Sequence, residues 1–533
     1  MPRSLAESIP VWRENAAGEG QAGPAGANTT LPRAAQVCVI GAGISGLTTG
    51  YLLQRLGHEV LVLDAHGVGA GETGRTTAHL TAVLDDRFYQ LERLFGAEKA
   101  YLAAESHRSA IDLIEAIVQD ESIDCDFERV DGYLICTAAT PRKQFEDEME
   151  AARRAGFVDL EVQEPVRAPG ILLEGPALRF PRQAAFHIGR YMDGLAREFR
   201  ERGGRLVTGA RARATAVTGG RHAHVDLANG TSVAADHIVV ATHTPFNDRV
   251  AMHTKQAAYR TYVVGFEVAR DSFPAQLVWD MEDPYHYVRR VRGVGRDVVI
   301  AGGEDHKTGE ANDAAARYSR LESWARANIS GLGAVVYQWS GQVMEPVDGL
   351  AFIGRNPLDD DNVYIVTGDS GNGMTHGTVA GFLICDLVSG RLNPWEHLYD
   401  PTRKTLKAVP TFVGENADAV AHMVKDRVKS GDVREREDIA RGEGAIVRDG
   451  MSHVAVYRDE HGNLEEHSAV CTHLGCLVQW NSGEKSWDCP CHGSRFAVDG
   501  SVLNGPAVAV LKPVEPEDLP PAEPIIDELR PAD

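Results

Sequence analysis

Four of the eight cysteines in this sequence crowd into one short segment near its end, together with two histidines. The segment reads Cys-Thr-His-Leu-Gly-Cys over 471–476 and Cys-Pro-Cys-His-Gly-Ser over 489–494. Thiolate and imidazole both bind iron, and imidazole brings less negative charge to it. Two cysteines on one iron and two histidines on the other raise the potential of a 2Fe-2S cluster above that of an all-cysteine cluster. The segment therefore predicts an iron–sulfur centre.

These two strings resemble those of the cytochrome bc-type Rieske proteins. The resemblance implies four ligands of a Rieske-type 2Fe-2S cluster, namely Cys471, His473, Cys489 and His492. It also implies that Cys476 and Cys491 form a disulfide bond that pins the two loops together. Many other Rieske ferredoxins and oxygenases lack this second cysteine pair, so its presence narrows the subtype.

Zinc is the rival metal, because Cys and His at such spacing can bind it tetrahedrally. Six candidate ligands rather than four, with a histidine in each cysteine loop, favour iron. A purely structural disulfide leaves the two histidines unexplained. A disulfide is also unusual in a cytosolic protein, so we expect burial beside the cluster to protect this one from glutathione.

Two residues near the second loop bear on the redox potential of the cluster. In the high-potential relatives, a serine and a tyrosine hydroxyl donate hydrogen bonds to the cluster sulfurs and favour the reduced state. Ser494 is the matching serine, whereas Phe496 occupies the tyrosine position and cannot donate. We therefore expect a potential below that of those relatives.

A second chemical signal lies near the start of the chain. The string Gly-Ala-Gly-Ile-Ser-Gly over 41–46 follows an apolar run, opens a helical pattern, and precedes Asp64 at the end of the next strand pattern. Such glycines permit a tight turn and a close approach to a pyrophosphate, to which a helix N-terminus offers N–H groups. This context predicts a dinucleotide site in which Asp64 accepts hydrogen bonds from ribose hydroxyls. The expected contacts of the loop are Gly41, Gly43, Ile44, Ser45 and Gly46.

Later segments resemble, in the right order, those of D-amino-acid-oxidase-like flavoproteins, which include glycine, sarcosine and gamma-glutamylputrescine oxidases. Residues 69–76 resemble the loop that runs past the flavin, and 235–242 resemble a short strand of the flavin domain. Residues 345–354 resemble the P-x-x-D-G-x-P-x-I-G segment, and 367–374 resemble the loop whose amides meet the isoalloxazine ring. The resemblance covers about 35–400 and favours FAD over NAD. It implies further FAD contacts at Gly74, Arg75, Thr76, Ala241, Thr242, Gly371, Asn372, Gly373 and Met374.

Some members of that family hold flavin covalently through a histidine after the second strand. Thr76 falls at that position here, so the resemblance implies non-covalent FAD. His79 lies nearby and is expected to be a structural or ring-contacting histidine.

The same family binds its substrate between the flavin and an antiparallel sheet. The β-branched and aromatic residues of 255–305 predict such a sheet here. The candidate substrate contacts are Tyr262, Tyr285, Tyr287 and His306. Sheet packing explains these residues equally well. Tyr262, Tyr287 and His306 are therefore retained only as candidates for catalysis, and no acid or base is assigned.

The elements that position these residues predict an α/β Rossmann-like FAD-binding domain with an antiparallel-sheet substrate domain, followed by a small all-β Rieske domain. Residues 1–34, rich in Gly, Ala, Asn and Pro, are typical of a flexible leader. The oxidoreductase is expected at 35–401, a connector at 402–436 with a helix over 420–433, and the Rieske domain at 437–533. The FAD-binding parts are expected at about 35–100, 180–245 and 340–401, with the substrate-domain parts between them.

Composition narrows the range of partners. The net charge of -22 disfavours binding to phosphate backbones and to anionic membrane surfaces. No apolar run is long enough to span a bilayer, and the N-terminus lacks the apolar stretch of a secretory signal. We therefore expect a cytoplasmic protein with no nucleic-acid partner and no membrane insertion.

Together these signals predict an FAD-dependent oxidoreductase of the amine or amino-acid dehydrogenase or oxidase type. A small-molecule substrate gives a hydride to FAD, and single electrons pass through the Rieske cluster to an external acceptor, a protein or a quinone. Two alternatives stay open. In one, a donor sends electrons through the cluster to FAD, as in a reductase. In the other, O2 oxidises the flavin directly and the Rieske domain is structural or sensory.

Overall fold

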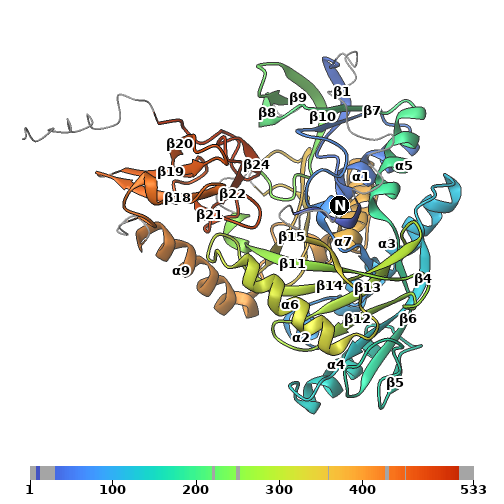
Figure 1. Ribbon diagram of the computed structural model, residues 1–533. Helices are drawn as coiled ribbons and strands as arrows, with labels where there is room; N and C mark the ends of the chain where they lie inside the picture. The colour runs from blue at the N-terminus through green and yellow to red at the C-terminus, as the bar shows by residue number, and fades with distance from the viewer. Residues whose placement is uncertain are drawn as a thin grey trace, which may run out of the picture.

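The computed structural model describes residues 8–12, 31–218, 222–247, 252–357, 359–425, 431–450 and 452–514. Figure 1 shows a large body, formed by the first 400 residues or so, with a smaller β-rich lobe against its side. The small lobe is built from the C-terminal strands, and a long helix runs beneath it. The expected division into an oxidoreductase and a C-terminal all-β domain is confirmed.

The FAD-binding sheet forms around β1 (Ala34–Ile40), which is mostly buried because parallel strands flank it on both sides. The strand order is β16-β17-β10-β1-β2-β7, and β9 and then β8 continue from β10 on a branch. The other strands are β2 (Val60–Asp64), β7 (Arg205–Thr208), β8 (Ala212–Thr218), β9 (His222–Leu227), β10 (Ser232–Val240), β16 (Phe352–Arg355) and β17 (Val363–Thr367).

Two helices that follow glycine-rich turns cross closely beside this sheet. They are α1 (Ile44–Arg55) and α7 (Gly373–Val388). A Cβ atom on Gly377 would lie 2.6 Å from Oγ of Ser45, so glycine is needed where the two helices meet. This contact brings the loops before both helices to one place. The helices α3 (Ala97–Asp120) and α5 (Ile188–Glu201) pack against this pair.

The second sheet is the predicted substrate-domain sheet. Its strand order is β15-β11-β14-β13-β12-β4-β6-β3, with β5 beside β6, and its four strands within 255–307 pair antiparallel as expected. The strands are β3 (His79–Leu80), β4 (Glu128–Ile135), β5 (Glu161–Gln163), β6 (Ala177–Ala185), β11 (Gln256–Ala269), β12 (Gln276–Asp280), β13 (Tyr287–Val291), β14 (Arg296–Lys307) and β15 (Val335–Pro346). The remaining helices of this body are α2 (Phe88–Phe95), α4 (Arg142–Arg154), α6 (Ala314–Asn328) and α8 (Glu396–Tyr399).

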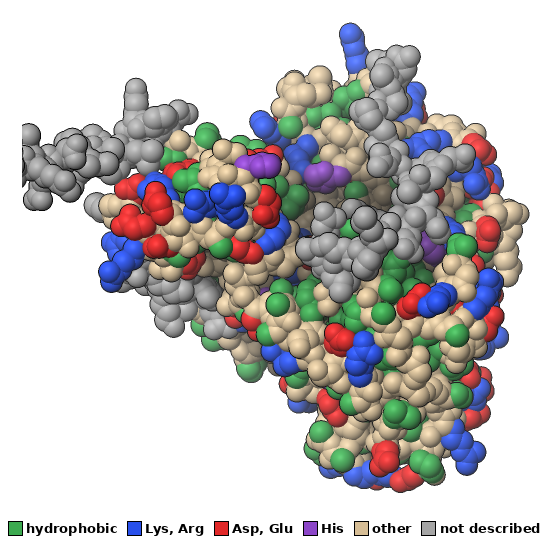
Figure 2. Space-filling view, in the orientation of Figure 1, with side chains coloured by type: hydrophobic (Ala, Val, Ile, Leu, Met, Phe, Trp, Pro, Cys, Tyr) green, Lys and Arg blue, Asp and Glu red, His purple; other side chains and the backbone are tan. Residues whose placement is uncertain are grey.

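The Rieske domain consists of two small antiparallel sheets around a core that contains Trp487 and Phe496. The strands are β18 (Glu443–Asp449), β19 (Ser452–Arg458), β20 (Leu464–Ser468), β21 (Gln479–Asn481), β22 (Ser486–Asp488), β23 (Arg495–Phe496) and β24 (Val502–Asn504). Gly431 and Val433 already form bridges to Val447, so the domain includes residues before the expected start at 437. Acidic and basic side chains are interspersed over the face of this domain that Figure 2 shows.

Two further features differ from the sequence-based expectations. Residues 8–12 of the expected flexible leader pack onto the body, because the indole of Trp12 is buried and donates a hydrogen bond to the carbonyl of Thr76. The connector helix α9 (Val409–Lys425) begins earlier than predicted. Residues 1–7, 13–30 and 426–430 lie outside the described residues. No helix in the described ranges has the length and apolarity that a bilayer crossing requires.

Candidate active site and cluster site

A cavity of about 280 Å³ lies where the two glycine loops meet the substrate sheet. Most of the residues predicted to contact FAD line it. These are Gly41, Gly43, Ile44, Ser45, Asp64, Arg75, Thr76, Ala241, Thr242, Gly371, Asn372, Gly373 and Met374. Gly46 and Gly74 are not among the lining residues that the structure describes.

Those two glycines shape the turns instead. A Cβ atom on Gly46 would lie 1.9 Å from the carbonyl oxygen of Gly41, and one on Gly74 would lie 2.4 Å from that of Gly69. Gly41 itself has φ +110° and no room for a side chain, since its Cβ would lie 2.3 Å from the carbonyl oxygen of Ala241. The first loop is therefore bare backbone beside a helix N-terminus, which fits a pyrophosphate.

Asp64 holds this loop in place. Its Oδ2 accepts the N–H of Ala42 at 2.8 Å, and its Oδ1 accepts the N–H groups of His66 and Gly67 at 2.7 and 2.8 Å. The carboxylate thus joins the glycine loop to the loop after β2 while still lining the cavity. Its expected bond to a ribose hydroxyl stays a prediction.

At the other end of the cavity, a buried carboxyl group reaches the second glycine loop. A Cβ atom on Gly371 would lie 2.0 Å from Oδ2 of Asp85, so the two groups are in close contact. Tyr285 donates a hydrogen bond to the same oxygen at 3.2 Å. Burial raises the pKa of Asp85 to about 6. Burial likewise raises the pKa of Asp305, which hydrogen-bonds Thr261, to about 7.

Aromatic rings complete this end of the cavity. The hydroxyl of Tyr287 lies 2.8 Å from that of Thr261, and its ring packs over Gly302, where a Cβ atom would lie 2.1 Å from it. His79 lies edge-on to Tyr287, with 5.6 Å between ring centroids. Burial and the nearby Arg289 lower the pKa of His79 to about 3, so the ring is neutral. Trp279 also lines this end.

Tyr262 and His306 do not line the cavity, within the residues that the structure describes. Thr261 and Val263 do, and the side chain between them points to the opposite face of β11 because strand residues alternate. On that face, Tyr262 stacks on His306 and packs edge-on against Tyr318. Tyr262 and His306 therefore lie away from the described cavity lining, whereas Tyr285 and Tyr287 are part of it, and contact of the latter two with substrate stays a prediction.

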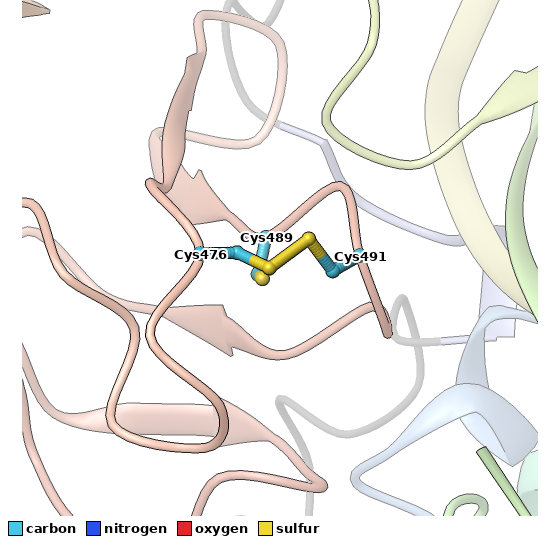
Figure 3. Close-up of side chains that lie close together, drawn as sticks. All are labelled: Cys476, Cys489 and Cys491. Carbon is cyan, nitrogen blue, oxygen red and sulfur yellow. A yellow bond between two sulfur atoms is a disulfide. The ribbon is translucent and has the colours of Figure 1, made fainter. Parts of the chain in front are cut away.

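In the Rieske domain, the disulfide between Cys476 and Cys491 is present and joins the two loops, as predicted. Figure 3 shows it with the sulfur of Cys489 close by. The thiols of Cys471 and Cys489 lie within hydrogen-bonding reach of each other, which lowers the pKa of Cys471. Two free thiols are thus held side by side at a buried position.

The rings of His473 and His492 pack against each other. The ring centroids of His473 and His492 are 5.0 Å apart. Nδ1 of His492 is buried and has no hydrogen-bond partner among the described residues. Two imidazole rings in contact, one with an orphaned nitrogen, and two adjacent free thiols are the donor types that a Rieske-type 2Fe-2S cluster needs. The site therefore fits that cluster.

A third histidine, which sequence reasoning missed, contacts this pair. His253 lies in a short 3-10 helix (His253–Lys255) of the oxidoreductase body, and its ring packs edge-on against His473 and His492 at 4.8 and 5.8 Å between centroids. The histidine side of the cluster site thus faces the oxidoreductase body. No local motif marks His253, because only domain docking brings it to the cluster site.

Comparisons with known proteins agree with this architecture. The family described as FAD dependent oxidoreductase matches residues 36–387, and the Rieske [2Fe-2S] domain matches 429–515. The chain belongs to the DAO family of FAD-dependent oxidoreductases and carries a C-terminal Rieske domain. These families bind FAD and a 2Fe-2S cluster, so the chain is a two-cofactor redox enzyme.

Some relatives match both domains of this chain, and others match the oxidoreductase part. The chain is 33% identical over 489 residues to the Rieske 2Fe-2S iron-sulfur protein YhfW of Bacillus subtilis, covering 90% of this chain and 93% of that one. It is 24% identical to gamma-glutamylputrescine oxidoreductase of Escherichia coli, covering 74% of this chain and 93% of the relative. The structure of glycine oxidase from Geobacillus kaustophilus matches with a TM-score of 0.58 and 17% identity, over 70% of this chain and all (100%) of the other. That last likeness shows the fold.

Proposed function

We propose that this enzyme is an FAD-dependent amine or amino-acid dehydrogenase that passes electrons through its Rieske domain to an external acceptor, a protein or a quinone. Bound FAD supplies hydride acceptance, and a 2Fe-2S cluster supplies one-electron carriage. We propose that Cys471, Cys489, His473 and His492 hold the cluster. The predicted glycine-loop residues that line the cavity would hold FAD without a covalent bond.

One contact supports direct exchange between the two centres. Gln342 of β15 lines the FAD cavity, and its Nε2 donates a hydrogen bond at 2.9 Å to the carbonyl of Gly493. Gly493 follows His492, a proposed cluster ligand. A single buried side chain therefore spans the distance between the cavity wall and the cluster loop. A structural or sensory Rieske domain needs no such connection.

The acidic and aromatic end of the cavity supports a cationic amine as the substrate class. Asp85 lies beside the loop that meets the flavin ring in the family. Asp305 hydrogen-bonds the cavity-lining residue Thr261, so its carboxylate, when ionised, adds negative charge to the same end of the cavity. An ionised Asp85 attracts an ammonium group, and the faces of Tyr285 and Tyr287 add cation–π attraction. The similarity to a protein named for gamma-glutamylputrescine agrees with this class.

The residues in the cavity then have distinct tasks. Asp85, held by Tyr285, orients the amine and can receive the proton that it loses. The neutral ring of His79, with Trp279 and Tyr287, excludes water from the reacting carbon. No further acid or base is required for hydride transfer beside nitrogen.

Anaerobic titration of the purified holoprotein with a panel of amines and amino acids tests this function. The expected result is flavin bleaching together with the EPR signal of a reduced Rieske cluster, both dependent on one class of amine. Substrate-dependent hydrogen peroxide release in air, with the cluster still oxidised, would instead identify an oxidase. Flavin reduction only from a chemically pre-reduced cluster would identify a reductase.

A further inference from the structure

One wall of the FAD cavity is built by the Rieske domain. The lining residues include Leu503, Asn504, Gly505, Ala507 and Val508, which lie at the end of β24 and in the loop after it. We infer that this 503–508 wall is part of the FAD-binding site, so that Rieske docking and FAD binding stabilise each other. This inference requires the FAD site and not the proposed direction of electron flow.

The wall is anchored at the end of the cavity that contains Asp64. Arg211, a cavity-lining residue, donates a hydrogen bond at 2.8 Å to the carbonyl of Val502. The same guanidinium lies 2.9 Å from the ring of His66, which in turn hydrogen-bonds the backbone of Leu503. The dinucleotide loop and the Rieske domain are thus joined where the ribose is expected.

A second anchor lies further along the cavity. Nδ2 of Asn504 donates hydrogen bonds to Glu72 at 2.7 Å and to Oε1 of Gln342 at 3.2 Å. Glu72 also accepts the backbone N–H of Gln342 at 2.7 Å. Burial alone would raise the pKa of Glu72, but nearby cationic groups, among them Arg495 and Arg75, lower it and keep the carboxylate charged. All three bonded residues line the cavity, so the wall is bonded to the flavin-side loop (Glu72–Arg75).

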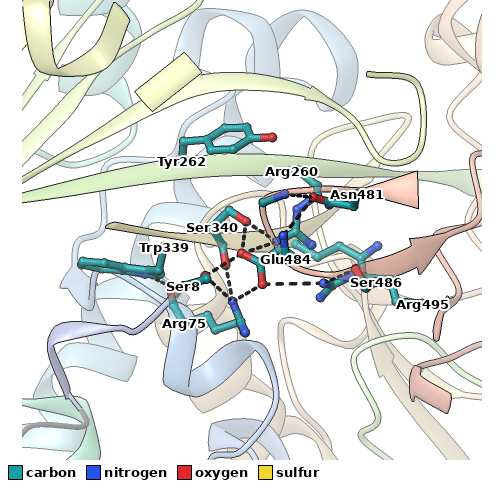
Figure 4. A network of polar contacts seen from close by, with 12 residues as sticks. Ser8, Arg75, Arg260, Tyr262, Trp339, Ser340, Asn481, Glu484, Ser486 and Arg495 are labelled. Atoms are coloured by element: carbon teal, nitrogen blue, oxygen red, sulfur yellow. Dashed lines mark hydrogen bonds and ion pairs between the residues drawn. The ribbon is translucent and has the colours of Figure 1, made fainter. Parts of the chain in front are cut away.

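A buried ionic network holds the two domains together behind this wall. Figure 4 shows Glu484 of the Rieske domain at its centre. Its carboxylate lies 2.7 Å from Arg75, 3.4 Å from Arg260 and 3.7 Å from Arg495, and its side chain is only 2% exposed. Ser8 and Ser340 donate hydrogen bonds to it as well. Undocking would separate buried opposite charges, which is costly, so the wall is closed at rest.

A closed wall has a thermodynamic consequence. If FAD contacts residues of both domains, it binds the docked form more tightly than the undocked form. By linkage, the factor by which docking tightens FAD binding equals the factor by which bound FAD tightens docking. Both directions can be measured without substrate.

The first test is a bulky substitution in the interface between the two domains, at a position outside the cavity. Ala314, at the start of α6, is 5% exposed. It packs against Gly483 of the Rieske domain, where an added Cβ atom would lie 2.7 Å from the Cβ atom of Ala314. Ala314→Leu therefore overpacks the docked interface without touching a cavity residue. The matched control is Ala316→Leu, which places the same side chain on an exposed position of the same helix.

Release of FAD from the full-length holoprotein is followed by the fluorescence of the freed flavin after dilution. Ala314→Leu is expected to release FAD about tenfold faster than wild type, because FAD leaves from the undocked form and 1.4 kcal/mol of lost docking raises the population of that form tenfold. Ala316→Leu should match wild type. Unchanged release from Ala314→Leu, with faster hydrogen exchange showing a loosened interface, would overturn the inference.

The second test uses the wild-type chain and so does not depend on a variant that folds. Hydrogen exchange of residues 500–508 is compared before and after FAD is stripped, with the cluster EPR signal showing that the Rieske domain is intact. Removal of FAD should raise exchange in this segment and leave strands β18 and β19, which do not line the cavity, unchanged. Equal exchange in both states would refute coupling even if amines later prove to be substrates.

Discussion

The carboxylate of Glu484 lies 2.7 Å from the guanidinium of Arg75, although 409 positions separate the two residues in the chain. Arg75 belongs to the loop that lines the FAD cavity, and Glu484 belongs to the Rieske domain. The pair thus joins the two halves of the enzyme beside their shared cavity. It is buried, and Arg260 and Arg495 supply further positive charge.

Glu484→Gln should destabilise the docked enzyme by about 3 kcal/mol, because it leaves buried guanidinium groups without their anion. The free energy of unfolding, measured in urea, is the readout. The control is Glu322→Gln, which removes a carboxylate that pairs with Arg326 on the surface of α6. The control should cost less than about 1 kcal/mol. Equal effects of the two substitutions would show that the buried network does not stabilise docking.

The same network predicts a loss of stability in acid. Burial alone would raise the pKa of Glu484, but Arg75, Arg260 and Arg495 hold it below its ordinary value of 4.5. A lowered folded-state pKa contributes stability above the unfolded-state pKa, which is lost as pH falls. Thermal unfolding of wild type should therefore shift to lower temperature below about pH 4.5, and Glu484→Gln should flatten this dependence.

Gln342→Leu should slow reduction of the cluster by substrate about tenfold in a single turnover, because it removes the hydrogen bond to Gly493. The midpoint potentials of both centres should stay as in wild type. Asn312→Ala is the matched control, since Asn312 accepts the N–H of Ser482 across the same interface but does not line the cavity. A wild-type rate in Gln342→Leu would exclude this side chain as the connection.

The disulfide closes a loop of 15 residues. The double substitution Cys476→Ser with Cys491→Ser should lower the stability of the Rieske domain by about 3 kcal/mol. Iron loss during dialysis should accelerate in parallel, because the ligand loops are no longer joined. Thiol trapping of the native wild-type protein should leave both cysteines unmodified, and labelling of either one would contradict this account.

The pH dependence of catalysis should report the buried carboxyl groups. The pKa of Asp85 is raised to about 6 and that of Asp305 to about 7. Both are neutral at lower pH, so kcat/KM for a cationic amine should rise as pH increases through this range. Asp85→Asn should raise KM and remove the lower step of the profile. A flat profile in wild type would argue against a charged carboxylate at the substrate.

Ser494 and Phe496 allow the redox potential to be changed in either direction. The hydroxyl of Ser494 hydrogen-bonds the thiol of Cys471. Ser494→Ala should lower the cluster potential by about 60 mV, and Phe496→Tyr should raise it by a similar amount if the new hydroxyl reaches a sulfur. Ser501→Ala, elsewhere in the domain, is the control. Redox titration followed by EPR checks all three.

Local patterns predicted much of this molecule, because the chemistry concerned is local. The glycine string needs a strand before it and a helix after it, and all three lie within residues 34–55. The four proposed cluster ligands and the disulfide were implied by the resemblance of two short loops to Rieske sequences, and both loops are visible in the sequence. The order of the domains could also be predicted, because the sequence changes near residue 437 to short strand patterns separated by tight turns.

Contacts that depend on packing could not be predicted in the same way. Tyr262 lies in a strand of the predicted antiparallel sheet. Which residues of that strand face the cavity depends on how the two sheets are placed, and the sequence does not show this. Asp85 follows an apolar run with no motif of its own, and only tertiary packing brings its carboxyl to Gly371. His253 and Gln342 acquire their roles because the Rieske domain docks where it does.

The position of the 503–508 wall in the chain sets an order of assembly. During translation, the ribosome completes the glycine loops long before it reaches the residues that close the same cavity. The nascent oxidoreductase body can fold, but its dinucleotide cleft stays open on one side until residues 503–508 have emerged. Docking of the later-made Rieske domain would then precede firm retention of flavin in the maturing enzyme.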